Sequence, residues 1–140
     1  MPTRNIQIGK AGEYLAASYL ARIFDEVLHT GESCRYDYLV TSEQGNFKIQ
    51  VKTTEYVFDH HTDKWVRWDI KKKKTGSKEY RTYDPKDVDI FAFVCLPIDK
   101  AVFVANHKLG KTFQKKLSYL KKQNTIGTLE NAIAIAKAVR

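Results

Sequence analysis

Two carboxylates at unusual places have the chemistry of a metal-dependent hydrolytic site. Glu13 lies in an apolar run with helical spacing, within about 20° of Leu20 and Phe24 around the helix axis. Burying a carboxylate there is costly unless it is paired or binds a metal ion, although a buried ion pair or a shifted helix register would also explain it. Asp37 lies in an aromatic, strand-forming run where Asp is disfavoured, unless it is a strand-end carboxylate that faces water.

An amide and an ammonium group complete the set. Strand alternation places Gln50 and Lys52 on one face, which could also be an ordinary solvent-facing surface. A hairpin can bring Asp37 beside them, and a helix packed on the sheet can bring Glu13 over them. Two carboxylates and an amide oxygen suit Mg²⁺, and a lysine can orient the attacking water or stabilise the pentavalent phosphorane. The pattern therefore predicts phosphodiester hydrolysis.

Hydrophobic periodicity predicts the elements that must position these residues. The predicted helices are residues 8–29, 112–122 and 128–139, the last with Thr128 as a candidate N-cap. The predicted strands are residues 34–41, 47–54, 65–70, 88–96 and 100–105, with a turn at 43–46 and a basic loop at 71–78. The order is helix, three strands, basic loop, two strands and C-terminal helices, without an internal repeat or a domain linker. We therefore expect a single domain over residues 1–140.

The order of these residues resembles a known family of nucleases. Gly12-Glu13, then residues 35–38 (Arg-Tyr-Asp-Tyr), then residues 49–53 (Ile-Gln-Val-Lys-Thr) are similar to the PD-(D/E)xK, or restriction-endonuclease-like, pattern. That pattern places Glu on the first helix, Asp at the start of a hairpin and Glu/Asp-x-Lys on its second strand. More closely, the chain resembles intron-encoded homing endonucleases of this fold, which also carry Gln before x-Lys. They share a late run like residues 88–92 followed by a hairpin, so the resemblance covers about residues 8–108.

The resemblance implies an α/β, restriction-endonuclease-like domain, with a central mixed β-sheet flanked by an N-terminal helix and C-terminal helices. It implies a Mg²⁺-dependent, site-specific endonuclease that cuts double-stranded DNA. The implied catalytic residues are Glu13, Asp37, Gln50 and Lys52, and the implied metal-binding residues are Asp37, Gln50, Val51 and Glu13.

Two departures from the general pattern keep alternatives open. Asp37 is not preceded by Pro, and Gln50 replaces an acid and adds no charge to a metal site. One metal ion instead of two, or a catalytically inactive DNA-binding module, would fit this change. A Holliday-junction or repair nuclease shares the same site pattern.

The charge of the chain favours a polyanionic partner. Lys and Arg number 24 against 16 Asp and Glu, a net charge of +8. We expect DNA contacts from a basic segment interleaved with aromatic residues, with a solvated charged loop as the alternative. The candidates are Arg67, Lys71, Lys72, Lys73, Lys74, Lys78 and Arg81. Trp65 and Trp68 in the same segment could instead belong to the core.

The proposed cleavage of duplex DNA has a consequence for the assembly of the chain. Cutting both strands of a duplex requires two active sites or a rearrangement, so we expect a homodimer or homotetramer. Residues 133–139 are the candidate interface, unless this helix covers its own sheet.

Cys34 and Cys95 lie in apolar, strand-like runs and are expected to be reduced thiols. Without an apolar signal region or a long apolar span, we expect a cytoplasmic protein that does not cross a membrane. Residues 59–63 contain two adjacent histidines and are expected to form a loop and not a metal site.

Overall fold

The computed structural model describes residues 4–31, 34–70, 72–73, 80–81 and 87–140, with residues 72–73 and 80–81 described by their backbone alone. The helices are α1 (Arg4–Leu20), the 3₁₀ turn η1 (Leu96–Ile98), α2 (Leu117–Lys122) and α3 (Thr125–Ala138). The strands are β1 (Glu26–His29), β2 (Tyr38–Ser42), β3 (Gly45–Thr54), β4 (Val57–His60), β5 (Asp63–Asp69), β6 (Lys72–Lys73), β7 (Tyr80–Arg81), β8 (Ile90–Cys95), β9 (Lys100–Ala105) and β10 (Thr112–Lys116).

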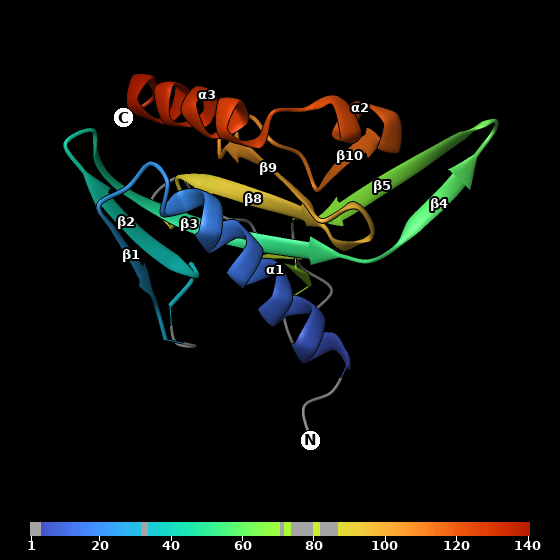
Figure 1. Cartoon of the computed structure of the whole chain (residues 1–140), viewed down its shortest axis with the longest axis horizontal. Coiled ribbons are helices and arrows are strands. Elements are labelled where there is room, and N and C mark those ends of the chain that lie inside the picture. The colour runs from blue at the N-terminus through green and yellow to red at the C-terminus, as the bar shows by residue number, and fades with distance from the viewer. Residues whose placement is uncertain (1–3, 32–33, 71, 74–79, 82–86) are drawn as a thin grey trace.

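Within these residues, a mixed five-stranded sheet forms the centre of the molecule (Figure 1). Its strand order is β1-β2-β3-β8-β9; β3 and β8 run parallel and the other neighbours antiparallel. A smaller antiparallel sheet has the order β10-β5-β4, and its β4–β5 hairpin projects away from the central sheet in Figure 1. The expected α/β class with a mixed central sheet, an N-terminal helix and C-terminal helices is confirmed.

Both faces of the central sheet are covered, which explains the nearly continuous apolar sequence of β8. One face packs against α1 and α3, with Leu20 and Leu129 fully buried against it. The opposite face packs against β5 and α2, through Trp68 and Leu120. All six residues of β8 are therefore buried, as expected for a central parallel strand.

The contact between α1 and β3 is close enough to require a glycine. A Cβ atom at Gly12 would lie 1.8 Å from the Oγ1 atom of Thr53 and 2.7 Å from its Cβ atom. Because Thr53 Cβ cannot move by side-chain rotation, only Gly allows this approach. The next residue along the helix is Glu13, so this contact sets how near its side chain comes to β3.

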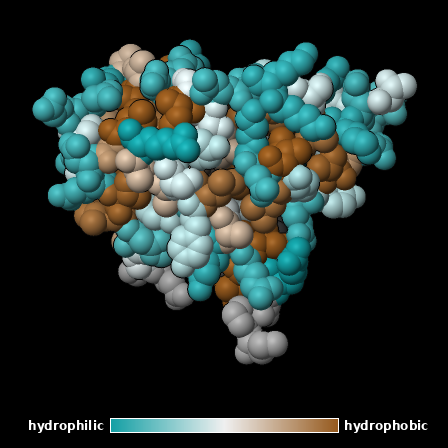
Figure 2. Space-filling model, viewed as in Figure 1, coloured by the Kyte–Doolittle hydropathy of each residue, from teal (hydrophilic) through white to brown (hydrophobic). Residues whose placement is uncertain are grey.

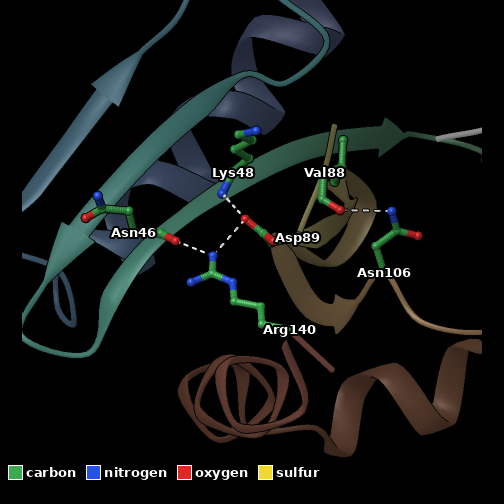
Figure 3. A network of polar contacts seen from close by, with 6 residues as sticks. All are labelled: Asn46, Lys48, Val88, Asp89, Asn106 and Arg140. Carbon is green, nitrogen blue, oxygen red and sulfur yellow. Dashed lines mark hydrogen bonds and ion pairs between the residues drawn. The ribbon is translucent and has the colours of Figure 1, made fainter. Parts of the chain in front are cut away.

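A polar network fixes the register of the parallel pair (Figure 3). Asp89 accepts a hydrogen bond from Lys48 N at 2.8 Å, and its own N–H donates to Lys48 O at 2.9 Å. The guanidinium of Arg140 donates to Asp89 Oδ2 at 3.1 Å and to the carbonyl of Asn46. The C-terminal residue therefore joins the β2–β3 hairpin to the start of β8.

Two expectations about the elements are wrong. Residues 26–29 form strand β1, because α1 ends at Leu20; Phe24 reaches the core from a turn, 5.9 Å from the ring of Phe47. Residues 112–116 form β10 and not a helix, because Phe113 pairs with Trp68 and stacks on Phe93 at 4.3 Å.

Smaller differences concern caps and strand ends. Asn124, and not Thr128, caps α3 by accepting a hydrogen bond from Gly127 N at 3.0 Å. The hydroxyl of Thr128 instead accepts from Phe103 N of β9 at 3.0 Å. Residues 34–37 are a bend before β2, and Cys34 is exposed, so its expected role as a small apolar residue is wrong. Of residues 59–63, expected as a loop, Asp59 and His60 end β4 and Asp63 begins β5.

Most of the visible surface is hydrophilic (Figure 2), and the described helices are short or polar. Figure 2 shows hydrophilic side chains over most of one face of the molecule, with apolar ones in separate clusters between them. Across the described part of the chain, every helix is too short or too polar to cross a bilayer.

Candidate active site

Asp37 lies one residue before β2, and its side chain takes the place of a backbone carbonyl in one hydrogen bond with β3. Its N–H donates to Ile49 O at 2.8 Å, and its Oδ2 accepts from Val51 N at 2.8 Å. The carboxylate is therefore held against the edge of β3 at the point where β2 begins. The disfavoured Asp in this aromatic run thus has a specific structural partner.

Strand β3 presents the remaining candidates from two directions. In a strand the N–H and C=O of one residue point to the same edge, so the carbonyl of Val51 points toward the Asp37 side. The side chains of Gln50 and Lys52 point to the face opposite Ile49 and Val51. Lys52 is only 8% exposed. Although it is buried, this residue lines the same cleft as Asp37.

Glu13 reaches this point from α1. Its side chain is 26% exposed, and its carboxyl group interacts electrostatically with the carboxyl of Asp37. Burial, and then the negative charge of Asp37, raise the pKa of Glu13, whereas His29 opposes them. Two carboxyl groups in such contact are stable when a proton or a cation lies between them.

Tyr38 fixes the backbone of Glu13. Its hydroxyl donates to the carbonyl oxygen of Glu13 at 3.0 Å. Burial, together with the charges of Glu13 and Asp37, raises the pKa of Tyr38 to about 12, so the phenol keeps its proton and remains a donor. The β2 strand thus positions the helix residue as well as Asp37.

An open cleft of about 1140 Å³ brings the candidates together. Glu13, Asp37, Gln50, Val51 and Lys52 all line it. The lining also includes residues of the small sheet, of the start of α1 and of the end of β3. These further lining residues include Asn5, Gly9, Tyr56, Arg67, Lys111 and Thr112.

The donor set fits a hard divalent cation. Two carboxylates, an amide oxygen and a backbone carbonyl are the oxygen ligands that Mg²⁺ takes, with water completing its shell. Among the described residues, no group of three or more His, Cys, Asp and Glu side chains is arranged to hold a metal ion. A metal site here would therefore depend on Gln50 and Val51 in addition to the acidic pair.

The candidate DNA contacts divide into three groups. Arg67 is exposed on β5, lines the cleft and lies 3.9 Å from Asp69. The backbones of Lys72, Lys73 and Arg81 lie in the two-stranded β6–β7 pair, in which Lys72 opposes Arg81. Lys71, Lys74 and Lys78 lie outside the described residues.

Other sequence signals have different outcomes. Trp68 is core, and its indole Nε1 donates to Val94 O at 3.0 Å. His60 and His61 lie at the tip of the β4–β5 hairpin, with ring centres 4.2 Å apart. The β4–β5 turn is outside the set of residues that line the cleft.

Three residues near the site could not be chosen from sequence. His29 lies 3.6 Å from Glu13, Tyr56 is 70% exposed at the cleft mouth, and Lys111 lines the far wall. Lys111 carries only the general signal of a basic surface. His29 ends the run predicted as a helix, Tyr56 follows a predicted strand, and neither carries a signal, since only the packing of separate elements brings them here.

The fold and the site together define a restriction-endonuclease-like nuclease domain, with acidic residues from α1 and the β2–β3 hairpin beside a lysine on β3. A sequence model of the PD-(D/E)XK endonuclease family matches residues 5–138, and the chain therefore belongs to this family. The resemblance noted from the sequence is confirmed.

Comparison with solved structures gives the same fold. The chain is similar to the bacterial homing endonuclease I-Ssp6803I, with a TM-score of 0.70 and 15% sequence identity over 97% of this chain and 95% of that chain. At this level of identity, the likeness establishes the shared fold. A search of curated proteins finds no match to the chain.

Proposed function

We propose that this protein is a Mg²⁺-dependent endonuclease that hydrolyses double-stranded DNA at specific sites, in the manner of a homing endonuclease. One observation carries the proposal: the Glu13–Asp37 carboxyl pair lies beside the buried Lys52 in one open cleft of a PD-(D/E)XK family member. The net charge of +8 supports a polyanionic substrate.

Each residue has a distinct role in this proposal. Asp37, Glu13, Gln50 and the carbonyl of Val51 would hold the cation. When bound, Mg²⁺ would polarise the phosphodiester and lower the pKa of a water molecule so that it can attack. Lys52 contributes a fixed positive charge in a buried position, where it orients the attacking water or stabilises the charge that develops on the phosphoryl group.

Substrate binding would use the walls of the cleft and the basic segment. Arg67 lines the same cleft as Glu13 and is exposed to solvent, as a phosphate or base contact requires. The remaining proposed DNA contacts are Lys71, Lys72, Lys73, Lys74, Lys78 and Arg81. Their charges supply affinity, and their interaction with DNA should weaken as the salt concentration rises.

A plasmid assay tests the proposal. Supercoiled DNA carrying a library of duplex sequences is incubated with the protein and Mg²⁺, with or without EDTA. We expect cleavage that EDTA abolishes. Lys52→Ala and Asp37→Asn should lower the cleavage rate by at least about 100-fold, in the range for loss of a charge-stabilising group.

A matched control comes from the same strand and face. Lys48→Ala removes one ammonium group from β3 without touching the cleft and should cut at nearly the wild-type rate. Both lysine variants should still bind duplex DNA in a gel shift. Wild-type cleavage by Lys52→Ala would place the active site elsewhere.

The replacement of an acid by Gln50 keeps a second candidate, a catalytically inactive DNA-binding module. This alternative predicts DNA binding without cleavage under any divalent cation. Including a four-way junction beside linear duplex in the assay distinguishes a junction nuclease, which would cut the junction preferentially.

We also propose that the active form is a homodimer or homotetramer. The candidate site is built from residues of one chain, and cutting both strands of a duplex needs two such sites or a rearrangement. The expected interface at residues 133–139 is covered only in part: Ile133 and Ala136 are buried against this chain's own sheet, whereas Ile135 and Val139 are exposed. The contact between chains would therefore use exposed apolar residues such as these.

A further inference from the structure

The edge strand β1 brings a histidine to the acidic pair. Its last residue, His29, pairs with Tyr38 on β2, which in turn pairs with Ile49 on β3. This row crosses the sheet beside Asp37. The Nε2 atom of His29 lies 3.6 Å from Oε2 of Glu13, although the two residues lie on different elements.

The ring of His29 has a defined orientation. It packs edge-on against the ring of Tyr38, with centroids 5.3 Å apart and planes at 73°. The separation of 3.6 Å is longer than a hydrogen bond, but at this distance the polar N–H group of an imidazole is attracted to a carboxylate. The ring contact with Tyr38 limits how far the His29 ring can move away from Glu13.

Glu13 is therefore held at two points. The hydroxyl of Tyr38 fixes its backbone carbonyl, and His29 contacts its carboxylate. Without the second contact, the Glu13 side chain would turn toward solvent for two reasons. It has three rotatable bonds and would keep more conformational entropy there, and it would move away from the negative charge of Asp37. A polar ring nitrogen 3.6 Å from the carboxylate opposes that motion.

We propose that His29 is a positioning residue that holds the Glu13 carboxylate in its metal-binding orientation beside Asp37. His29 acts through Glu13 and does not ligate the metal: His29, Glu13 and Asp37 are not arranged as a three-ligand site among the described residues. Residues that contact a metal ligand without binding the metal themselves orient that ligand, and their loss weakens metal binding. This inference rests on the proposed function, since it assumes that the acidic pair binds the cation.

Calorimetric titration of the DNA-free protein with Mg²⁺ tests the role of His29. We expect His29→Ala to weaken Mg²⁺ binding by about tenfold, the low end of the range for such residues, because its side chain is 59% exposed. His29→Gln should restore most of the affinity, because its amide nitrogen can reach the position of Nε2. His107→Ala, which removes an exposed histidine far along the chain, should bind Mg²⁺ like the wild type.

Two further readouts separate positioning from general stability. In EDTA, the melting temperatures of His29→Ala and the wild type should agree closely. In the cleavage assay, His29→Ala should need more Mg²⁺ for its half-maximal rate while its KM for DNA changes little.

The outcomes decide between the two proposals. Equal Mg²⁺ affinity for His29→Ala and the wild type would overturn the inference, as would a loss that tracks a lower melting temperature and is not rescued by His29→Gln. A wild-type protein that binds Mg²⁺ but cuts no DNA would overturn the proposed function alone, and the affinity comparison would still decide the role of His29. A wild-type protein that binds no Mg²⁺ would overturn both.

Discussion

Gln50 is the residue at which this chain departs from the acidic pattern of its family, and its position makes the departure testable. Its side chain lines the cleft on the same face of β3 as Lys52. An amide oxygen can ligate Mg²⁺ but adds no negative charge, so the site has two acidic side chains where a third would be expected. The cation would therefore be held less tightly than by an all-carboxylate site.

Gln50→Glu should tighten Mg²⁺ binding, because hard cations favour charged oxygens. We expect the Mg²⁺ concentration for the half-maximal cleavage rate to fall by about tenfold, which corresponds to about 1.4 kcal/mol. The maximal rate should not rise, because the added charge also opposes the approaching phosphate. Cleavage rates measured against Mg²⁺ concentration check this.

Gln44→Glu is the matched control, since it adds the same charge at the exposed β2–β3 turn. Its Mg²⁺ dependence should equal that of the wild type. If Gln50→Glu also leaves both the Mg²⁺ dependence and the rate unchanged, Gln50 lies outside the metal shell.

The two cysteines should differ in reactivity. Cys34 is exposed, whereas Cys95 is buried in β8, and burial raises the pKa of its thiol, which a backbone hydrogen bond at Ile98 only partly offsets. A raised pKa lowers the thiolate fraction at neutral pH, and the thiolate is the reactive form. We expect an aromatic disulfide reagent to label one thiol in the folded protein and two in denaturant. Rapid labelling of both in the folded protein would contradict the burial of β8.

At the scale of elements, the contact between α1 and β3 sets the position of Glu13. Gly12→Ala would force a Cβ atom into Thr53. We expect the free energy of unfolding to fall by about 1–3 kcal/mol, as for other overpacked cores. Cleavage should also fall in fully folded protein, because the helix must move away from β3 and take Glu13 with it. Urea unfolding and the plasmid assay measure the two effects.

Gly9→Ala on the same helix provides the comparison for stability. A Cβ atom at Gly9 meets nothing within 4 Å, so this change should stabilise the helix by up to about 1 kcal/mol through helix propensity. If Gly12→Ala were as stable as Gly9→Ala, the close approach of α1 to β3 would be disproved.

At the scale of the whole molecule, the proposed function predicts that more than one copy of the chain assembles. We expect gel filtration at micromolar concentration to give at least twice the chain mass of 16.2 kDa. Exposed apolar residues outside the C-terminal helix, such as Ile6, Tyr14 and Leu28, are available for contacts between chains. Elution as a monomer at every concentration at which the protein cuts both strands would contradict this assembly.

Local patterns in the sequence were sufficient for much of the fold. The alternation of β3 and the continuous apolar run of β8 identify a hairpin strand that is buried mainly on one face and a central strand that is buried on both, because burial on one or two faces determines the residue types along a strand. The same reasoning failed at residues 26–29 and 112–116. Both are strands because partners distant in the chain pair with them, Tyr38 with His29 and Trp68 with Phe113.

The candidate site, like the fold, was predicted only in part from the sequence. The types and order of Glu13, Asp37, Gln50 and Lys52, together with their resemblance to the PD-(D/E)xK pattern, were enough to propose a metal-dependent nuclease. Only the tertiary structure showed that Gly12 brings α1 onto β3, that Asp37 bonds to Val51 N, and that His29 lies against Glu13. Chain order specifies which groups are present, but distances between groups on separate elements depend on how those elements pack, and packing is decided by contacts that no local pattern records.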